Sequence, residues 1–346
     1  MFGARPLPRT LEAAVRDATS TKPAVRAEAV RQLVPHAEEA RERVIRTLEK
    51  ALRDEVAEVR VQAVTGLADL AAVEALPALL LAVEDDAPLV RQMALTALGE
   101  IGDPRATERI RRALSDERAD VRFQAVIAYP RVSASREAAL DALVDATFDK
   151  DPLVAHIALR MAEEVSQGDE EKRAPVGPRF LERARALVGK GDPTVRVAAA
   201  ILLAHAKDRG GDGVLDALAR GELKTSDPQD EAEAIELAGE LGLTGAKPGL
   251  EKRAWGGLLG LRRDRFAWHA RVALARMGHE RAEREILKEL ESKDRDRCTL
   301  AVAAAGRAKL VAAKGRLEEL QGNERRADPT AVADALAAIA EREDRS

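Results

Sequence analysis

Apolar and polar positions along the chain follow the rhythm of amphipathic helices from about residue 10 to residue 342. In the clearest stretch the residues of one helix face recur at spacings of three and four: Val90, Ala94, Ala97, Leu98 and Ile101. Gly99 and Gly102 are expected to end this helix, and Asp103-Pro104 to begin the next with an N-cap and a first-turn proline. No stretch alternates with the period of two that a half-buried strand requires. The pattern predicts an all-α protein.

One motif recurs along the chain at intervals of 28 to 41 residues. It consists of an Asp-containing turn, often with Pro, then Val-Arg, an Ala four residues after the Val and a Leu-like residue four further on. Clear copies place the Val position at 25, 59, 90, 121, 154 and 195, and weaker copies lie near 230, 269, 297 and 331. This interval is that of a helical repeat. Because one helix pair cannot bury its apolar face alone, we expect the pairs to stack.

The pattern Asp-Pro-x-Val-Arg-x-x-Ala-x-x-x-Leu-Gly resembles HEAT repeats, most closely the bacterial short variety named after the phycobilisome lyases. The resemblance extends over nearly the whole chain and is clearest in the first six copies. It implies a right-handed α-solenoid of about ten stacked antiparallel helix pairs. Such repeats serve many unrelated roles, so the resemblance predicts the fold and leaves the function open.

The repeats are expected to form two half-solenoids, residues 1–166 and residues 179–346. Between them, residues 167–178 lie in the widest gap between motif copies and are rich in charge, Gly and Pro. We interpret this segment as an enlarged loop, either a hinge or a surface insertion. The general tolerance of loops to insertion favours the second interpretation.

Composition narrows the class of protein. Charged residues make up 34% of the chain and aromatic residues only 2%, which suits thin layers of Ala and Leu better than one thick core. The lone Cys298 excludes an internal disulfide and a multi-cysteine metal site. No apolar run is long enough for a membrane span, and the start of the chain does not look like a signal peptide. These two features predict a cytoplasmic protein without membrane insertion. Arg greatly outnumbers Lys, as in GC-rich genomes, so we expect a bacterial source.

Five arginines occupy the same position of the repeat: Arg26, Arg60, Arg91, Arg122 and Arg196. They could form a basic stripe for nucleic acid. Alternatively, each could pair with turn carboxylates such as Asp86, Asp120 or Asp192 and tie one repeat to the next. The supply of nearby Asp, and the resemblance to HEAT repeats, favour the structural interpretation.

The positions two and six residues after the Val are expected to face the groove of the solenoid. They are Val61 and Thr65, Gln92 and Thr96, Phe123 and Ile127, His156 and Arg160, and Val197 and Ile201. Contiguous exposed apolar surface usually marks a partner site. The leading hypothesis is therefore a non-enzymatic scaffold or adaptor that binds another protein through a helix or extended segment. Phe123, Ile127, Val197 and Ile201 would anchor the segment, and His156 and Arg160 would set its register. The alternative is that curvature buries these residues.

A second candidate patch lies in residues 252–276, where both tryptophans fall among basic residues: Arg253, Trp255, Arg265, Trp268 and Arg271. Residues 251–300 carry nine acidic and thirteen basic groups, whereas residues 201–250 carry ten acidic and five basic groups. Interleaved cations and aromatics suit phosphate contact with base stacking. The alternative function is therefore nucleic-acid binding, or an enzyme similar to the HEAT-like DNA glycosylases. The acidic pI of about 5.9 makes nucleic acid unlikely, and structural packing is favoured over an anionic partner.

Other chemistry has little support in the sequence. The five histidines offer no two-ligand spacing on one helix face, and Cys298 is expected to be a buried, inert thiol. The Gly-rich stretch at residues 210–213 follows no strand pattern and so is not expected to cradle phosphate. We expect no catalytic residue, no metal and no cofactor.

Overall fold

The computed structural model describes residues 9–167, 175–256 and 264–343. In these residues it holds α-helices and short 3-10 turns and no strand, which confirms the all-α prediction. Contacts within the chain divide it into two compact units, residues 1–180 (unit 1) and residues 181–346 (unit 2). The loop expected at 167–178 lies mostly outside the described residues, so its role as a hinge or an insertion stays a prediction.

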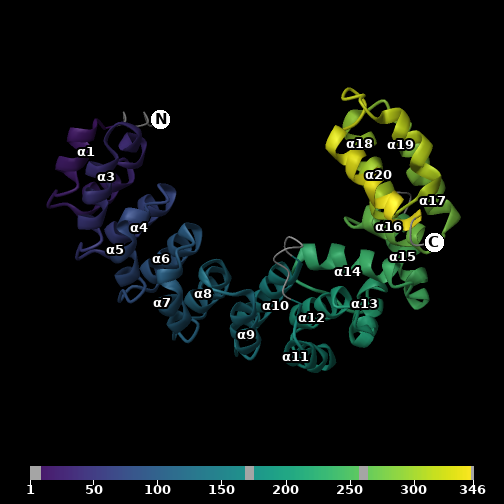
Figure 1. Ribbon diagram of the computed structural model, residues 1–346, viewed down its shortest axis with the longest axis horizontal. Coiled ribbons are helices and arrows are strands. Elements are labelled where there is room, and N and C mark those ends of the chain that lie inside the picture. The colour runs from purple at the N-terminus through teal and green to yellow at the C-terminus, as the bar shows by residue number, and fades with distance from the viewer. Residues whose placement is uncertain (1–8, 168–174, 257–263, 344–346) are drawn as a thin grey trace. The chain divides into compact units, whose positions relative to one another are not determined.

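Unit 1 alternates outer helices with inner helices. The inner helices are α2 (Pro23–Arg31), α4 (Ala57–Asp69), α6 (Pro88–Ile101), α8 (Ala119–Val132) and α10 (Pro152–Gln167). The outer helices are α1 (Leu11–Asp17), α3 (Ala37–Ala51), α5 (Leu76–Ala82), α7 (Thr107–Ala113) and α9 (Arg136–Ala146). Each inner helix packs against the next inner helix, and Figure 1 shows α4, α6 and α8 in one row with α5, α7 and α9 in a second row.

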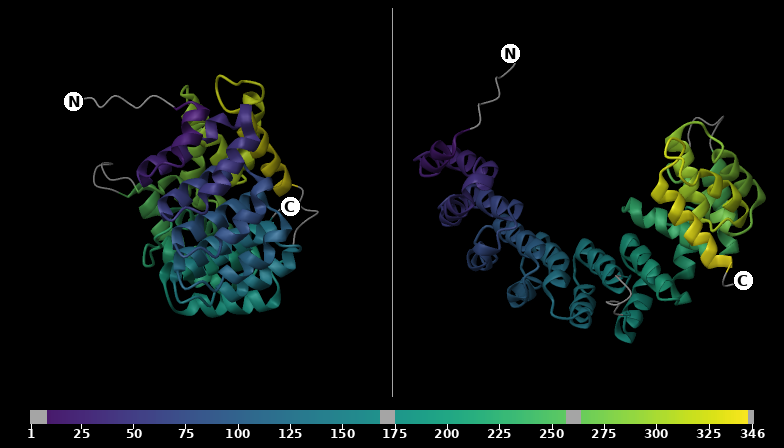
Figure 2. Two further views of the ribbon diagram at one scale, coloured as in Figure 1. Left: turned by 90° about the vertical axis from the view of Figure 1, so that its left-hand side faces the viewer. Right: turned by 45° about the horizontal axis from the view of Figure 1, so that its top comes forward.

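Unit 2 repeats this arrangement. Its inner helices are α12 (Pro193–His205), α14 (Pro228–Glu240), α16 (Ala267–Arg276), α18 (Arg295–Arg307) and α20 (Pro329–Glu343). Its outer helices are α13 (Asp212–Ala219), α15 (Lys247–Trp255), α17 (Glu280–Glu289) and α19 (Lys314–Leu320), and α11 (Pro178–Gly189) begins at the boundary between the units. The further views show the helix pairs of each unit stacked side by side (Figure 2). The expected solenoid of about ten helix pairs is confirmed.

The motif explains where the inner helices start and what they bury. In α6, Pro88 supplies the fixed φ of the first helical turn, and Gly102 ends the helix in the left-handed region at a φ of 69°. Gly99, also expected to end it, lies inside the helix and is buried. The Val, Ala and Leu positions of the motif, here Val90, Ala94 and Leu98, are all fully buried. They lie on one helix face because their spacing is four residues. The apolar core of each unit therefore runs between its two rows of helices.

The fourth residue of each inner helix is the Arg position of the motif. In α2, α4, α6 and α8 this residue is Arg26, Arg60, Arg91 and Arg122, each no more than 8% exposed. Each guanidinium donates two hydrogen bonds of 2.6 to 2.9 Å to a carboxylate in the turn before the next inner helix: Asp54, Asp85, Asp116 and Asp149. These pairs confirm the structural interpretation for four of the five arginines. Of the expected partners, Asp86 also pairs with Arg60, whereas Asp120 pairs with Arg118 and Asp192 caps α12.

Successive pairs are joined into one ladder, which we call the Arg–Asp ladder. Arg26 binds the Asp54 carboxylate, while Arg60 Nη1 donates to the Asp54 backbone carbonyl at 2.9 Å. Arg91 has the same relation to Asp85. Each of these carboxylates also accepts the backbone N–H two residues later, as Asp54 does from Val56. The ladder therefore holds the turns that precede α4, α6, α8 and α10 with charge-assisted hydrogen bonds.

The ladder ends at α10, whose fourth residue is Ala155. In α12 the fourth residue is Arg196, whose Nε donates to the Val188 carbonyl at 3.1 Å. In α14 it is Glu231, so the charge is reversed, and Glu231 accepts a hydrogen bond of 2.9 Å from Arg253 of α15. The remaining inner helices carry uncharged residues there: Ala270, Cys298 and Val332. The units therefore use different contacts at the same position of the repeat.

Removing one Arg–Asp pair of the ladder should destabilise unit 1. Arg91→Ala leaves the Asp116 carboxylate, whose side chain is 13% exposed, without its guanidinium, and we expect the free energy of unfolding to fall by about 3 kcal/mol. Urea denaturation followed by circular dichroism measures the loss, and hydrogen exchange localises it to α6 and α8. The matched control is Arg111→Ala, whose 59% exposed side chain pairs with Glu108 and should contribute less than about 0.5 kcal/mol. Equal losses in both variants would contradict a structural ladder.

The ladder should also make unit 1 sensitive to acid. Hydrogen bonds from Arg26 lower the pKa of Asp54. Burial alone would raise the pKa of Asp85 and of Asp149. The hydrogen bonds from Arg60 and Arg122 outweigh this effect, so the pKa values of both carboxyls also lie below the usual range. A carboxyl whose pKa is lower in the folded state than in the unfolded state, where it is about 3.9, stabilises the fold at pH values above this unfolded-state pKa. This contribution is lost as the pH falls through the pKa of the folded state.

We therefore expect the urea midpoint to be steady from pH 7 to about pH 5 and to fall steeply below about pH 4. Asp85→Asn should be less stable than the natural chain at pH 7 and should lose less on acidification, because one titrating group is gone. A parallel loss in both proteins would show that the ladder does not carry the acid sensitivity.

Unit 2 depends instead on close helix approach at glycine. A Cβ placed on Gly239 of α14 would lie 2.4 Å from Ala273 Cα of α16, which no side chain can occupy. We expect Gly239→Ala to reduce the free energy of unfolding by about 1–3 kcal/mol, measured by urea denaturation. The control is Gly213→Ala in α13, where nothing lies within 4 Å and helix propensity should make the change neutral or stabilising by up to about 1 kcal/mol. A neutral Gly239→Ala would mean that α14 and α16 have room to separate.

Candidate functional site

One row of half-buried side chains runs along three inner helices of unit 1, α4, α6 and α8. They occupy the fifth and ninth helix positions, which share one face, opposite the buried third, seventh and eleventh positions. In α4, α6 and α8 these residues are Val61, Thr65, Gln92, Thr96, Phe123 and Ile127. The adjoining sixth positions add Gln62, Met93 and Gln124. We call these nine residues the inner stripe.

The inner stripe is uncharged, in a chain of which 34% is charged. The hydroxyls of Thr65 and Thr96 donate to carbonyls of their own helices at 2.9 and 3.2 Å, which leaves their methyl groups to face outward. Phe123 and Ile127 of α8 supply the largest apolar area, and the glutamine amides can both donate and accept. The stripe therefore combines apolar contact with neutral hydrogen-bonding groups.

The two candidate residues of α10 continue the same helix face. His156 is the fifth residue of α10 and is 8% exposed. Arg160 is the ninth residue, is half-buried, and forms an ion pair of 2.5 Å with Glu163 one turn further along. The structure thus brings Phe123, Ile127, His156 and Arg160 onto corresponding positions of neighbouring inner helices, as expected, and Arg160 already has a carboxylate partner.

The other two groove candidates, Val197 and Ile201, are core residues. They hold the fifth and ninth positions of α12, but both are 0% exposed and belong to the apolar cluster that contains Leu215 and Ile235. The expectation that they line an exposed apolar groove is therefore wrong. The alternative interpretation, burial among neighbouring helices, holds at these two residues because packing in unit 2 is close enough to cover them.

The inner helices of unit 2 present charged residues at the comparable face. Two of the contacts there are ion pairs, Arg276–Glu240 at 2.7 Å and Arg307–Glu236 at 2.6 Å, and two are hydrogen bonds of histidine, His205–Glu233 at 2.7 Å and His269–Glu236 at 2.6 Å. They border a cavity of about 400 Å³. Sequence reasoning missed these pairs because their partners lie on different helices, 28 to 71 residues apart.

In the second candidate patch, Arg253 and Trp255 of α15 are held by intramolecular contacts. Arg253 donates to Glu231 at 2.9 Å and to the Leu218 carbonyl at 3.0 Å. Trp255 Nε1 donates to Glu285 at 2.9 Å, and the Arg281 guanidinium lies 4.2 Å from the indole centroid. Burial raises the pKa of Glu285, but the hydrogen bonds from Trp255 and Arg281 outweigh it and the pKa lies below the usual range. These contacts favour packing over a stacking platform for bases.

The other members of the patch differ in exposure. Arg271 donates to the Ala254 carbonyl at 3.1 Å, pairs with Glu285, and lies 5.4 Å from the Trp268 ring centroid. Trp268 is half-buried and its Nε1 donates to a backbone carbonyl of α18 at 3.4 Å. Arg265 is 63% exposed and its Nη2 lies 3.4 Å from Glu231. The patch is therefore brought together in unit 2, and Arg265 is its most exposed cation. Its use by nucleic acid stays a prediction.

Two expectations concern the rest of the chain. Cys298 is fully buried and its Sγ donates to the Leu290 carbonyl at 3.3 Å, which confirms the buried thiol. Among the described residues, no helix combines the length and apolar character that a membrane crossing needs. The absence of a metal, a cofactor and a catalytic residue stays a prediction.

The fold and the Arg–Asp ladder define the class as an α-helical repeat protein. A family model of HEAT repeats matches residues 45–130 and, overlapping them, residues 76–163, which run from α3 into α10. Residues 45–163 therefore match HEAT repeats, as the motif predicts, and the described helices form an α-solenoid. No curated protein sequence matches the chain.

Several solved structures are similar to the chain. An engineered protein aligns with a TM-score of 0.43 and 19% identity over 95% of this chain and 98% of its own. The complex of CpcE and CpcF of phycocyanin lyase from Nostoc sp. aligns with a TM-score of 0.42 and 16% identity over 72% of this chain and 96% of that chain. A computationally designed armadillo repeat protein for modular peptide recognition aligns with a TM-score of 0.42 and 21% identity over 57% of this chain and 99% of that chain.

Proposed function

We propose that the protein is a non-enzymatic scaffold that binds a segment of another protein on the inner stripe of unit 1. The observation that carries the proposal is the uncharged character of the nine stripe residues in a highly charged chain. Phe123 and Ile127 of α8 are its anchors, because they are half-buried yet apolar and large. Arg160 of α10 would orient the segment by a charge at one end.

The geometry of the stripe suits an extended segment. Neighbouring helices pack about 8–10 Å apart, and an extended chain advances about 3.3 Å per residue. One repeat therefore corresponds to roughly three residues of the bound segment. A segment of about ten residues would cross α4, α6, α8 and α10. The amides of Gln92 and Gln124 can then bond its backbone groups, while apolar side chains of the segment contact Phe123 and Ile127.

The same stripe is unsuited to nucleic acid. Phosphates need cations, and none of the nine stripe residues carries one. The ladder arginines cannot serve, because Arg60, Arg91 and Arg122 are buried and bound to aspartates. A neutral surface with amides and apolar groups favours a peptide.

The proposal is tested by peptide selection with counter-selection. A library of random twelve-residue peptides is enriched on the natural chain, and binding of the enriched peptides is then measured to the double variant Phe123→Asp/Ile127→Asp. We expect at least about a tenfold loss of affinity, because two apolar contacts are replaced by desolvated carboxylates. Circular dichroism and urea denaturation of the variant check that unit 1 stays folded.

The matched control changes two exposed apolar residues of the same unit that lie away from the stripe. Leu81 of α5 and Val73, 65% and 48% exposed, are replaced together by Asp. The control should keep the affinity of the natural chain. If the enriched peptides bind the stripe variant and the natural chain equally well, the inner stripe is not the binding surface.

A further inference from the structure

A second site lies in unit 2, in a cavity of about 650 Å³ between the connection that follows α13 and helix α15. Its wall contains five cationic side chains and two carboxylates: Arg220, Lys224, Lys252, Arg253, Arg265, Glu231 and Asp264. The volume is that of a small-molecule site. Residues 252–276, the predicted segment, supply three of these cations, Lys252, Arg253 and Arg265. Arg220 and Lys224 lie outside that segment, and neither tryptophan lines the cavity, so the cavity is a different grouping.

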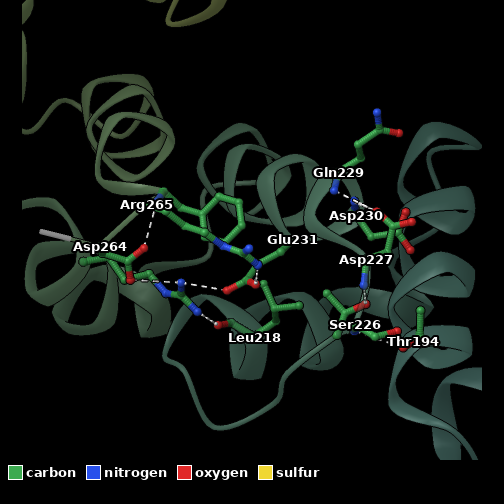
Figure 3. A network of polar contacts seen from close by, with 12 residues as sticks. Thr194, Leu218, Ser226, Asp227, Gln229, Asp230, Glu231, Asp264 and Arg265 are labelled. Atoms are coloured by element: carbon green, nitrogen blue, oxygen red, sulfur yellow. Dashed lines mark hydrogen bonds and ion pairs between the residues drawn. The ribbon is translucent and has the colours of Figure 1, made fainter. Parts of the chain in front are cut away.

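The two carboxylates of the cavity already accept hydrogen bonds from other groups of the protein. Glu231 is 13% exposed and accepts from Arg253 at 2.9 Å, and Asp264 accepts the Phe266 backbone N–H at 2.8 Å and Arg253 Nη1 at 3.3 Å. In Figure 3 Asp264 lies at the left and Glu231 near the centre, with Leu218 below Glu231. Arg253 also has protein partners for its other nitrogens: Nη2 donates to the Leu218 carbonyl and Nε to the Ala219 carbonyl. These three groups hold the wall of the cavity in place.

The remaining cations of the wall are open to a ligand. Lys224 and Lys252 are exposed and form no ion pair with any residue that the structure describes. Arg265 is 63% exposed and only its Nη2 approaches Glu231. Arg220 is 40% exposed and shares its charge with Asp216 and Glu222 outside the cavity. Thr225 adds a hydroxyl whose oxygen accepts the Asp227 N–H, which leaves its own proton to donate.

We infer that this cavity binds a phosphorylated small molecule, with Lys224, Lys252 and Arg265 on its phosphate. A phosphate group carries up to two charges and three acceptor oxygens, so it can meet donors from three directions. Lysine ammonium groups bind phosphate as point charges, and a guanidinium offers a second pair of donors. The cavity is larger than one phosphate, so the rest of it would take the body of the ligand. This site is separate from the inner stripe of unit 1.

The test uses isothermal titration calorimetry on the full chain at low salt, with inorganic pyrophosphate as the probe. We expect a dissociation constant at or below about 1 mM for the natural chain. In the double variant Lys224→Gln/Lys252→Gln we expect the dissociation constant to rise about tenfold or more. The matched control is Lys190→Gln/Lys293→Gln, which removes the same charge from two other exposed lysines of unit 2 and should bind as the natural chain does. Because all four lysines are exposed, both variants should melt as the natural chain does.

Three further probes define the ligand class: citrate, hexaglutamate and hexathymidylate. Pyrophosphate binding that exceeds that of all three supports the phosphate site. Equal or tighter citrate binding would overturn the choice of phosphate, and tighter binding of hexaglutamate or hexathymidylate would assign the cavity to an acidic peptide or a nucleic acid. The inference is also overturned if pyrophosphate does not bind, or if the two double variants lose affinity equally.

Discussion

Unit 1 depends on the burial of a row of guanidinium groups. A buried guanidinium is tolerated only when its donors are satisfied, and the turn aspartate of the following repeat does this with two bonds. The next arginine then binds the backbone of the same turn, as Arg60 does at Asp54. Each repeat is thereby registered against its neighbours on both sides. In α4, α6 and α8 the charged residues lie within the first four positions or at the thirteenth, so the positions between them, which include the inner stripe, are uncharged.

Unit 2 stacks the same kind of helix pair with different contacts. Where the ladder would continue, Glu231 reverses the charge and binds Arg253, and the later inner helices place Ala270, Cys298 and Val332 at that position. Backbone contact at Gly239 brings α14 and α16 together instead. The Glu231–Arg253 pair also shapes the second site, because it holds the carboxylates of the cavity in place. Lys224 and Lys252 are then left without ion-pair partners among the described residues. A change in one repeat position therefore changes which surface is available for binding.

The groove prediction illustrates where helix periodicity stops being informative. Phe123 and Val197 hold the same position of the repeat, and periodicity places both on the inward face. Phe123 is half-buried and Val197 is fully buried, because exposure depends on how closely the neighbouring helices approach. The partners of the ladder arginines were likewise predicted only in part, since Asp86 does pair with Arg60. The residues expected, such as Asp86, lie in the right turns, yet the main partner of Arg60 is Asp85, whose carboxylate also accepts the Ala87 N–H.

The sequence by itself determined the helices, their pairing and the period of the stack, because a residue's place on a helix face depends only on its neighbours three and four positions away. It also favoured a structural role for the recurring Val-Arg position, which the buried Arg–Asp pairs of unit 1 confirm. Only the tertiary structure decided which candidate residues are covered, which carboxylates neutralise which arginines, and where two lysines meet at one cavity. Those outcomes depend on contacts between residues 22 to 71 positions apart, and their distances are set by helix packing.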